Sequence, residues 1–298
     1  MKIIIMPLAN DEVCVCGRCK RENRTASYTA MGTAVRRTWA AEKIEGIKTY
    51  YIYGRRAGIE FPTEFRDVVE DSCIYPEGFE IPKNEIGSTN VRRKRLPFAI
   101  DDCIYSDTPE GRENLYYKTI DGFEWLLENE EFDYVLRTTV GTYIDLHLLK
   151  QMVEKIGIKD NIYAGSKGVY SNSHNANQPP VIEYGSGSAF LISRNLVELL
   201  VKAERENTID LVRGHHKIKC IGDDPTIGKF IAYDLGVELI TWNKAEFTSV
   251  SQIGSNAINQ LQCYFCHQIN PELMYAVHRA KGLTIKDDVS SLLKGRHF

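Results

Sequence analysis

The chain alternates short apolar runs with longer stretches in which apolar residues recur every three to four positions. Strands that alternate with helices predict an α/β fold, in which helices cover a central sheet. The short runs predict buried β-strands at residues 3–8, 49–53, 97–105, 132–137, 161–165, 188–193 and 237–242. The longer stretches predict amphipathic helices at residues 111–128, 146–156, 195–204 and 226–235, and a further helix from Asn270.

The stretch 54–95 breaks this alternation, because it is rich in proline, glycine and charged residues. We interpret it as an insertion or excursion within a single main domain, which we expect to span residues 1–245. Residues 246–298 are expected to form a helical extension that packs on the same domain.

The composition narrows the classes of function that are possible. The 298 residues, 43% of them hydrophobic, suffice for one large domain or two small ones. The 37 basic and 40 acidic residues give a net charge of −3, which argues against a nucleic-acid partner. No apolar run approaches the roughly 20 residues of a membrane span. The N-terminal "MKIIIMPLA" is more typical of a first strand than of a signal peptide, so we expect a soluble, cytoplasmic protein.

Ligands of open α/β sheets bind beyond the carboxyl ends of the strands, so the residues that follow each strand are the first candidates for chemistry. Four stretches stand out there. They are "AVRRTW" (34–39), "ENLYYKTIDGFEWL" (113–126), "YGSGSAFLISRNLVELL" (184–200) and "IGDDPTIGKFIAYDLGVEL" (221–239).

The order of these stretches resembles the fringe and β-1,3-galactosyltransferase family. The resemblance covers roughly residues 30–55 and 96–240. It implies a GT-A-type, Rossmann-like fold with a mixed, mostly parallel sheet. It also implies a nucleotide-sugar donor, UDP-linked by analogy, and transfer to a glycan hydroxyl with inversion. The matching elements are Arg37-Thr38-Trp39, Asn114-Leu115 with Lys118-Thr119, the strand that ends in Arg137-Thr138, Gly185 to Ser193-Arg194, and Asp223-Asp224.

The sequence departs from this family at its metal site. The acidic triplet that holds manganese in the family falls here on Thr139, Val140 and Gly141, which are poor ligands for a hard cation. The stretch "NKAEFTSVSQ" (243–252) also lacks the family's histidine. We therefore expect catalysis without a divalent metal or another cofactor.

Fixed cations, hydroxyls and amide groups can neutralise a leaving diphosphate in place of a metal. The loop 138–142 offers hydroxyl and amide donors, including those of Thr138, Thr139 and Gly141. For each cation, a solvated surface charge is the simpler alternative. The candidate cations are Arg36, Arg37, Lys118, Arg137 and Lys167.

The resemblance makes Asp224 the general base for the acceptor hydroxyl, with Asp223 orienting it or binding the acceptor. The alternative is structural: Asp223 is an N-cap and Asp224 a first-turn acid, and Pro225 suits the start of a helix.

Two further groups are candidate ligand contacts. The small residues Gly185, Ser186, Gly187 and Ser188 could let the backbone approach an acceptor sugar, or could form a plain turn before a strand. Asp101 and Asp102, at a strand end, could contact the nucleotide, or could be ordinary loop acids.

The cysteines raise a separate question. A structural zinc site is one interpretation, with His267 as an alternative ligand; free thiols are the other. The basic run 91–95 ("VRRKR") is interpreted as a solvated loop, with a phosphate or anionic-glycan contact as the alternative. The candidate zinc ligands are Cys14, Cys16, Cys19, Cys263 and Cys266.

Two alternatives to an active enzyme stay open. The first is a non-catalytic relative that binds a nucleotide or a glycan, since the family's metal ligands are missing. The second, a zinc-containing nucleic-acid protein, is disfavoured by the balanced charge. Members of the family in the secretory pathway carry a membrane anchor, so its absence here favours a viral or bacterial enzyme of glycan biosynthesis.

Overall fold

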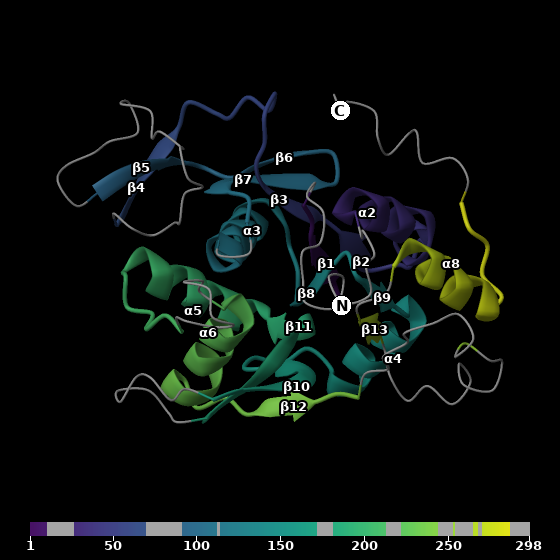
Figure 1. The fold of residues 1–298 in the computed structure, drawn as a ribbon. Coiled ribbons are helices and arrows are strands. Elements are labelled where there is room, and N and C mark those ends of the chain that lie inside the picture. Colours follow the sequence, from purple (N-terminus) through teal and green to yellow (C-terminus); the bar gives the residue numbers. More distant parts are fainter. Residues whose placement is uncertain are drawn as a thin grey trace.

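The computed structural model describes residues 1–10, 27–69, 91–111, 114–171, 181–212, 222–243, 253, 265–267 and 270–286. Within these ranges a nine-stranded sheet runs in the order β12-β10-β11-β8-β1-β3-β7-β6, with β2 also paired to β1 (Figure 1). Its strands are β1 (Ile3–Leu8), β2 (Ile47–Thr49), β3 (Tyr51–Arg55), β6 (Phe98–Ile100), β7 (Cys103–Pro109), β8 (Tyr134–Thr139), β10 (Tyr163–Ser171), β11 (Val181–Ser193) and β12 (Leu239–Thr241).

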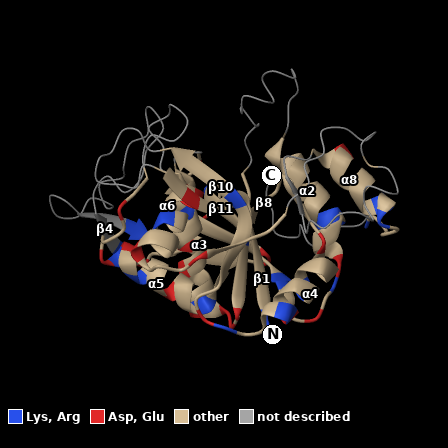
Figure 2. Cartoon of the chain, turned by 90° about the horizontal axis from the view of Figure 1, so that it is seen from below, with Lys and Arg blue, Asp and Glu red and all other residues tan. Residues whose placement is uncertain are grey.

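Most pairings in this sheet are parallel, and the antiparallel ones involve β6 and β11. Helices cover both faces. Figure 2 shows α3, α5 and α6 on one side of the sheet and α2, α4 and α8 on the other. The helices are α2 (Tyr28–Arg37), α3 (Leu115–Asn129), α4 (Leu146–Ile156), α5 (Arg194–Arg205), α6 (Asp223–Lys229), which continues into a π-helical turn (Phe230–Asp234), and α8 (Pro271–Ala280).

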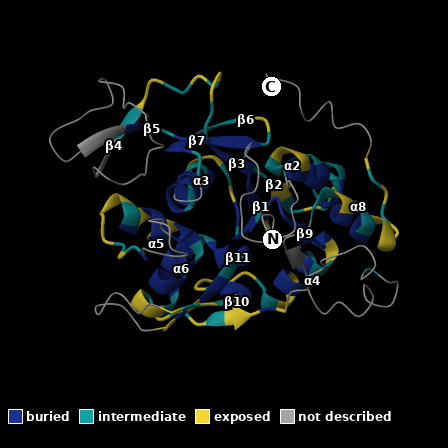
Figure 3. Cartoon of the chain, viewed as in Figure 1, coloured by how far each residue is buried: buried dark blue, intermediate teal, exposed yellow. Residues whose placement is uncertain are grey.

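Alternating side chains on the strands supply the two halves of the core, because successive residues of a strand face opposite sides. On β1, Ile3 and Ile5 pack with the α2, α4 and α8 side, whereas Ile4, Met6 and Leu8 pack with the α3, α5 and α6 side. Figure 3 shows the resulting buried sheet between partly exposed helices. This mixed, mostly parallel sheet flanked by helices confirms the predicted fold class.

The strand 3–8 and the helix 146–156 have the predicted bounds. Asp145 caps that helix, since its Oδ1 accepts from the backbone N–H of Leu148 at 3.0 Å. The run 97–105 is not one strand, because it turns back between β6 and β7 at Asp101, whose φ is +53°. The segment 185–188, for which a loop was the expectation, lies inside β11.

The C-terminal part contributes to the same core. Leu273, Met274 and Val277 of α8 are buried among the residues beside α2 and α4. A short strand, β13 (Phe265–His267), pairs with β9 (Thr142–Ile144) directly after the end of β8. No helix in the described part of the chain is both long and apolar enough to cross a membrane.

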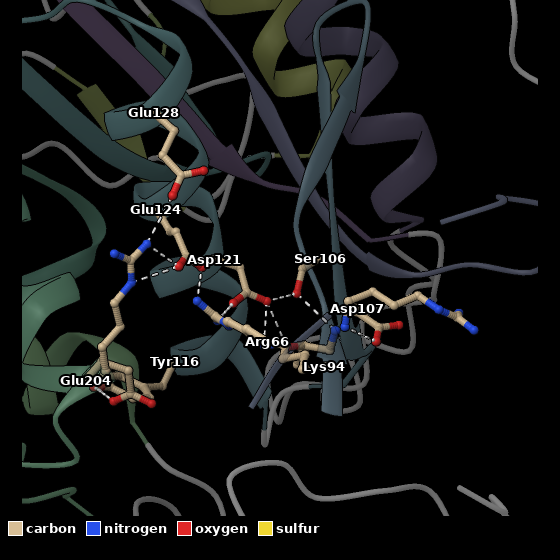
Figure 4. Close-up of polar contacts among 12 residues, drawn as sticks. Arg66, Lys94, Ser106, Asp107, Tyr116, Asp121, Glu124, Glu128 and Glu204 are labelled. Atoms are coloured by element: carbon tan, nitrogen blue, oxygen red, sulfur yellow. Dashed lines mark hydrogen bonds and ion pairs between the residues drawn. The ribbon is translucent and has the colours of Figure 1, made fainter. Parts of the chain in front are cut away.

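The described ends of the stretch 54–95 form an antiparallel hairpin, β4 (Phe65–Val69) with β5 (Val91–Arg95), and buried charges fasten it to α3 (Figure 4). Arg66 Nη2 and Lys94 Nζ lie 2.7 and 2.6 Å from the two oxygens of Asp121. Arg66 also pairs with Glu124, whose other partner is Arg205 of α5 at 2.6 Å. Burial acts to raise the pKa of Asp121, but Lys94 and Arg66 outweigh it and hold that pKa below its usual range.

Candidate active site at the carboxyl edge of the sheet

The carboxyl ends of β1 and β8 lie side by side, because Leu8 pairs with Thr139 in the parallel register. The antiparallel β11 crosses at the same edge, where Ala189 pairs with Thr138. Residues 185–188 therefore run past the end of β8 and meet the start of α6. This convergence brings Arg137, Gly187 and the two acids of α6 together.

Arg137 is the central cation of this cluster, and it is buried. Its Nη1 donates to the carbonyl oxygen of Gly187, and its Nη2 forms an ion pair with Asp223 Oδ2. The guanidinium carbon lies 5.5 Å from the ring centroid of Phe190 on β11. Thr119 of α3 adds a hydroxyl donor 3.2 Å from Asp223 Oδ2. Asp223 is thus held from two sides.

Asp224 differs from its neighbour in having no cation as a direct partner among the described residues. Its Oδ2 accepts from the backbone N–H of Gly187 at 2.8 Å, and its residue keeps partial exposure to solvent. Desolvation and the nearby charge of Asp223 raise the pKa of Asp224 to about 7, although Arg137 and the Gly187 hydrogen bond act to lower it. Such a carboxyl can take up and release a proton near neutral pH.

Asp223 and Asp224 occupy the first turn of α6, and the N-cap is Gly222. The capping alternative for Asp223 therefore does not describe this helix start. Its side chain is engaged by Arg137 and Thr119 instead of capping the helix.

Small residues on β11 permit this close approach. A Cβ on Gly187 would lie 2.9 Å from Arg137 Nη1 and 3.0 Å from Asp224 Oδ2. A Cβ on Gly185 would lie 2.9 Å from the Cβ of Phe190 and 3.1 Å from the hydroxyl of Tyr163. Residues 185–188 therefore do not form a turn before a strand. They lie within β11, where glycine leaves room for the neighbouring side chains.

Residues 138–142, predicted as a loop, are instead the end of β8, a turn at 140–141 and the start of β9. Hydrogen bonds to β11 hold this segment. The hydroxyls of Thr138 and Thr142 both donate to the carbonyl oxygen of Ser188, at 2.7 and 2.9 Å. Trp39 Nε1 donates to the Thr142 carbonyl at 3.1 Å. Thr139 is only half-buried, and its hydroxyl lies 3.3 Å from that of Thr142. Thr139 is therefore the hydroxyl of this segment that a ligand could reach.

The serines of β11 lie next to this segment. Ser188 Oγ is 3.2 Å from the hydroxyls of both Ser186 and Ser166, and it is buried. Ser186 is half-buried. The hydroxyls of Ser166, Ser188 and Ser186 thus form a short chain that ends at the half-buried Ser186.

Lys118 also lies at the carboxyl edge, but protein groups surround it. Its Nζ is 2.9 Å from the carbonyl oxygen of Ala9, just after β1, and 2.7 Å from Glu110 Oε2, just after β7. Glu110 in turn accepts from the backbone N–H of Gly54 at 2.6 Å. Lys118 thus ties three strand ends together, and it is buried.

Arg36 and Asp102 are not part of this cluster. Asp102 precedes β7, and the register of β7 with β3 places it at the amino edge of the sheet. Arg36, at the end of α2, pairs with it at 3.2 Å and lies 3.5 Å from the ring centroid of Tyr51. Asp101 forms the turn beside it. The predicted donor contacts of Arg36, Asp101 and Asp102 therefore fall away from the acids of α6.

Two more of the candidate cations have other partners. Arg37 Nε donates to the carbonyl oxygen of Lys286 at 2.9 Å and so joins α2 to the C-terminal segment. Lys167 pairs with Glu183 across β10 and β11 on the surface. Lys167 lies opposite Gly185 and so near the carboxyl edge, but on the surface. Of the cations that the sequence nominates, Arg137 and Lys118 are the buried ones at that edge.

The cysteine interpretation falls largely outside the described residues, which exclude Cys14, Cys16, Cys19 and Cys263. Cys266 lies on β13, where its backbone pairs with Tyr143. Within the described ranges no group of three or more His, Cys, Asp or Glu side chains is placed to hold a metal ion.

A surface hollow of about 480 Å³ lies at the opposite, amino edge of the sheet. Its charged rim is satisfied internally, because Lys48 pairs with Glu130 at 2.7 Å and Lys2 with Glu131 at 2.6 Å. Its two carboxyls, Glu130 and Glu131, have lowered pKa values and so stay ionised at neutral pH. The cluster around Asp224 is therefore the better candidate for chemistry.

Sequence reasoning missed several residues of this site. The hydrogen bond from Thr119 to Asp223 depends on how α3 packs against α6, which the sequence does not show. Glu110 comes directly after β7, so the rule that ligands bind beyond the carboxyl ends of strands would have identified it. Tyr163 orders the glycine strand through a 2.6 Å hydrogen bond from the backbone N–H of Gly185. An isolated strand tyrosine carries no signal of such a contact.

No protein-family model matches the chain, and no curated protein sequence matches it. Among solved structures, it resembles a glycosyltransferase involved in the glycosylation of the major capsid of PBCV-1, with a TM-score of 0.39 and 8% identity. That alignment covers 95% of this chain and 100% of the other. A likeness this distant carries no argument about activity, so the resemblance to fringe-type enzymes stays a prediction of the sequence.

Proposed function

We propose that the chain is a glycosyltransferase that moves a sugar from a nucleotide-sugar donor to a glycan hydroxyl with inversion, and that it needs no divalent metal. A UDP-sugar is the first donor to test. The proposal rests on the ordered sequence motifs together with one observation: Asp224 lies in the first turn of α6 at the carboxyl edge of the sheet, where Gly187 N–H holds its Oδ2 at 2.8 Å. Its raised pKa of about 7 suits a general base.

In the proposed reaction the Asp224 carboxylate takes the proton of the acceptor hydroxyl. The hydroxyl oxygen forms a bond to the anomeric carbon while the bond from that carbon to the phosphate oxygen breaks. The electron pair of the broken bond leaves with the nucleoside diphosphate. Attack on the face opposite to the leaving group inverts the anomeric centre.

The leaving diphosphate gains negative charge that polar groups must balance. We assign this task to hydroxyl and backbone donors of residues 138–142, at the end of β8 and in the turn that follows, of which Thr139 has the most accessible hydroxyl. Arg137 and Lys118 add positive potential from behind this edge, although their side chains already have protein partners.

The test is sugar transfer or donor hydrolysis across a panel of nucleotide sugars, with excess EDTA and with added Mn²⁺. We expect the same rate in both conditions. Asp224→Asn should lower kcat by about 10²–10⁴-fold, the range that a general base contributes. Full activity of the folded Asp224→Asn variant, or activity that needs Mn²⁺, would contradict the proposal.

A non-catalytic nucleotide- or glycan-binding protein is the second candidate. It is favoured by the buried state of Arg137 and Lys118, each of which already has a carboxylate partner. Thermal-shift measurements separate the two candidates, because a ligand that binds the folded state raises Tm whether or not turnover follows. Stabilisation by a nucleotide sugar that is never hydrolysed or transferred would select this second function.

A further inference from the structure

We propose that Arg137 is the positioning residue of the site: it holds the β11 segment whose Gly187 N–H binds Asp224, and it balances Asp223 so that Asp224 is the carboxylate left to accept a proton. The role of Asp224 as base rests on the proposed function. The contacts of Arg137 stand apart from it and can be tested without turnover.

The first part of the inference rests on a single residue, Gly187. Its carbonyl oxygen accepts from Arg137 Nη1, and its backbone N–H donates to Asp224 Oδ2 at 2.8 Å. The guanidinium therefore fixes one side of a peptide segment whose other side holds the base. Two donors on one planar group restrict that segment better than the single ammonium of a lysine would.

The second part rests on the charge balance. Two carboxyls and one guanidinium meet at the start of α6, and the guanidinium makes its ion pair with Asp223. Among the residues that the structure describes, the other titratable groups that face Asp224 are Tyr163 from β10 and Tyr184 from β11. Burial raises the pKa of both phenols above its usual range, so both are neutral neighbours of the acids near pH 7.

These two roles predict opposite effects of two substitutions. Asp223→Asn removes the neighbouring negative charge and keeps an oxygen acceptor for Arg137, so the pKa of Asp224 should fall. Arg137→Met removes the cation, so the pKa of Asp224 should rise further. Each change should be about one pKa unit or more, as for charges within about 4–6 Å.

The direct measurement is the ¹³C NMR titration of the Asp224 carboxyl, identified by its loss in Asp224→Asn. Lys202→Met, an exposed cation of α5, is the control and should leave the titration unchanged. A fall of the Asp224 pKa in Asp223→Asn supports the inference; an unchanged or higher value overturns it. If Arg137→Met fails to fold, Asp223→Asn still tests the charge balance, and the kinetics of Arg137→Lys test the positioning.

A kinetic readout tests the mechanical part. Arg137→Lys keeps the charge but cannot serve Gly187 and Asp223 in the same fork geometry. We expect kcat to fall by about 10²-fold, the cost of a misplaced catalytic group, with KM for the donor unchanged. A kcat equal to that of the wild type would refute this part. Asp224→Asn with full activity would instead refute the proposed function and leave the NMR result standing.

Discussion

Two clusters of buried acids can be compared within this chain. On α3, Asp121 and Glu124 are met by Lys94, Arg66 and Arg205, so cations and carboxylates are matched (Figure 4). At the start of α6, two neighbouring carboxyls face one arginine, which makes its ion pair with Asp223. The pKa of Asp121 lies below its usual range, whereas that of Asp224 rises to about 7.

Burial is common to both acids, so burial alone does not decide their protonation. The charges beside each acid decide it: Lys94 and Arg66 lie beside Asp121, whereas the carboxyl of Asp223 lies beside Asp224. The ion pairs of Asp121 and Glu124 fasten the β4–β5 hairpin to α3. Because the pKa of Asp121 is lowered, this acid stays ionised near pH 7. An unmatched carboxyl costs stability when it ionises, and such costs are concentrated at functional sites.

The largest expected effect is on the matched cluster. Asp121→Asn leaves Lys94 and Arg66 buried with less compensation, and we expect the free energy of unfolding to fall by about 3–5 kcal/mol. Urea denaturation at pH 7 measures it. Glu198→Gln, which removes an exposed partner of Arg194, is the control and should change stability by less than about 1 kcal/mol. Equal effects of the two variants would show that the ion pairs of Asp121 do not stabilise the attachment of the β4–β5 hairpin to α3.

The same type of substitution should have the opposite sign at the unmatched acid. Asp224→Asn removes a charge that the folded state disfavours, while an amide oxygen can still accept from Gly187. We expect a gain in the free energy of unfolding at pH 8 of at most about 4 kcal/mol, because one pKa unit corresponds to about 1.36 kcal/mol. If Asp224→Asn unfolds at a lower urea concentration than the wild type at pH 8, the ionised Asp224 does not destabilise the fold, and its contrast with Asp121 is wrong.

A smaller loss is expected at the crossing point of the site. Gly187→Ala introduces a Cβ 2.9 Å from Arg137 Nη1 and 3.0 Å from Asp224 Oδ2. We expect a loss of about 1–3 kcal/mol from overpacking. Gly141→Ala is the matched control for stability, since its Cβ would make contacts of 3.6 and 3.7 Å. Similar urea midpoints for both variants would mean that β11 can shift to make room.

The smallest expected effect is the pH dependence of stability, which differs in sign between Asp224 and Asp121. The folded pKa of Asp224 is above the value of 3.8 expected when unfolded, so its favourable contribution is complete below pH 4 and is lost as pH rises through 7. The folded pKa of Asp121 is below 3.8, so its contribution is present above pH 4 and is lost as pH falls through the folded value.

Stability of the wild type and Asp224→Asn should therefore diverge between pH 4 and 7, by at most about 1.4 kcal/mol per pH unit. Stability of the wild type and Asp121→Asn should converge below pH 4. Urea denaturation across pH 3–8 measures both trends. Parallel curves for Asp224→Asn and the wild type would show that Asp224 has an ordinary pKa.

The sequence predicted much of this fold, and the reasons are local. Apolar runs such as 3–8 and the capped helix after Asp145 carry their own signals. It also nominated Arg137, Gly187, Asp223 and Asp224, which the structure brings together, although their roles remain proposals.

What the sequence could not supply was the partner of each charge. Arg36 and Arg137 both follow apolar residues, yet one pairs with Asp102 at the amino edge and the other with Asp223 at the carboxyl edge. Arg66 and Asp121 are 55 positions apart in the sequence, and no local pattern predicts their ion pair. Register and topology decide these contacts.

The most direct test of the account is the titration of the Asp224 carboxyl in the wild-type protein by ¹³C NMR, with Asp224→Asn to identify its signal. The account predicts a single carboxyl at this site that titrates with a midpoint near 7 and is absent from the variant. A midpoint near 4 would mean that Asp224 is fully ionised at neutral pH and would contradict the claim that an unmatched acid is the centre of the site.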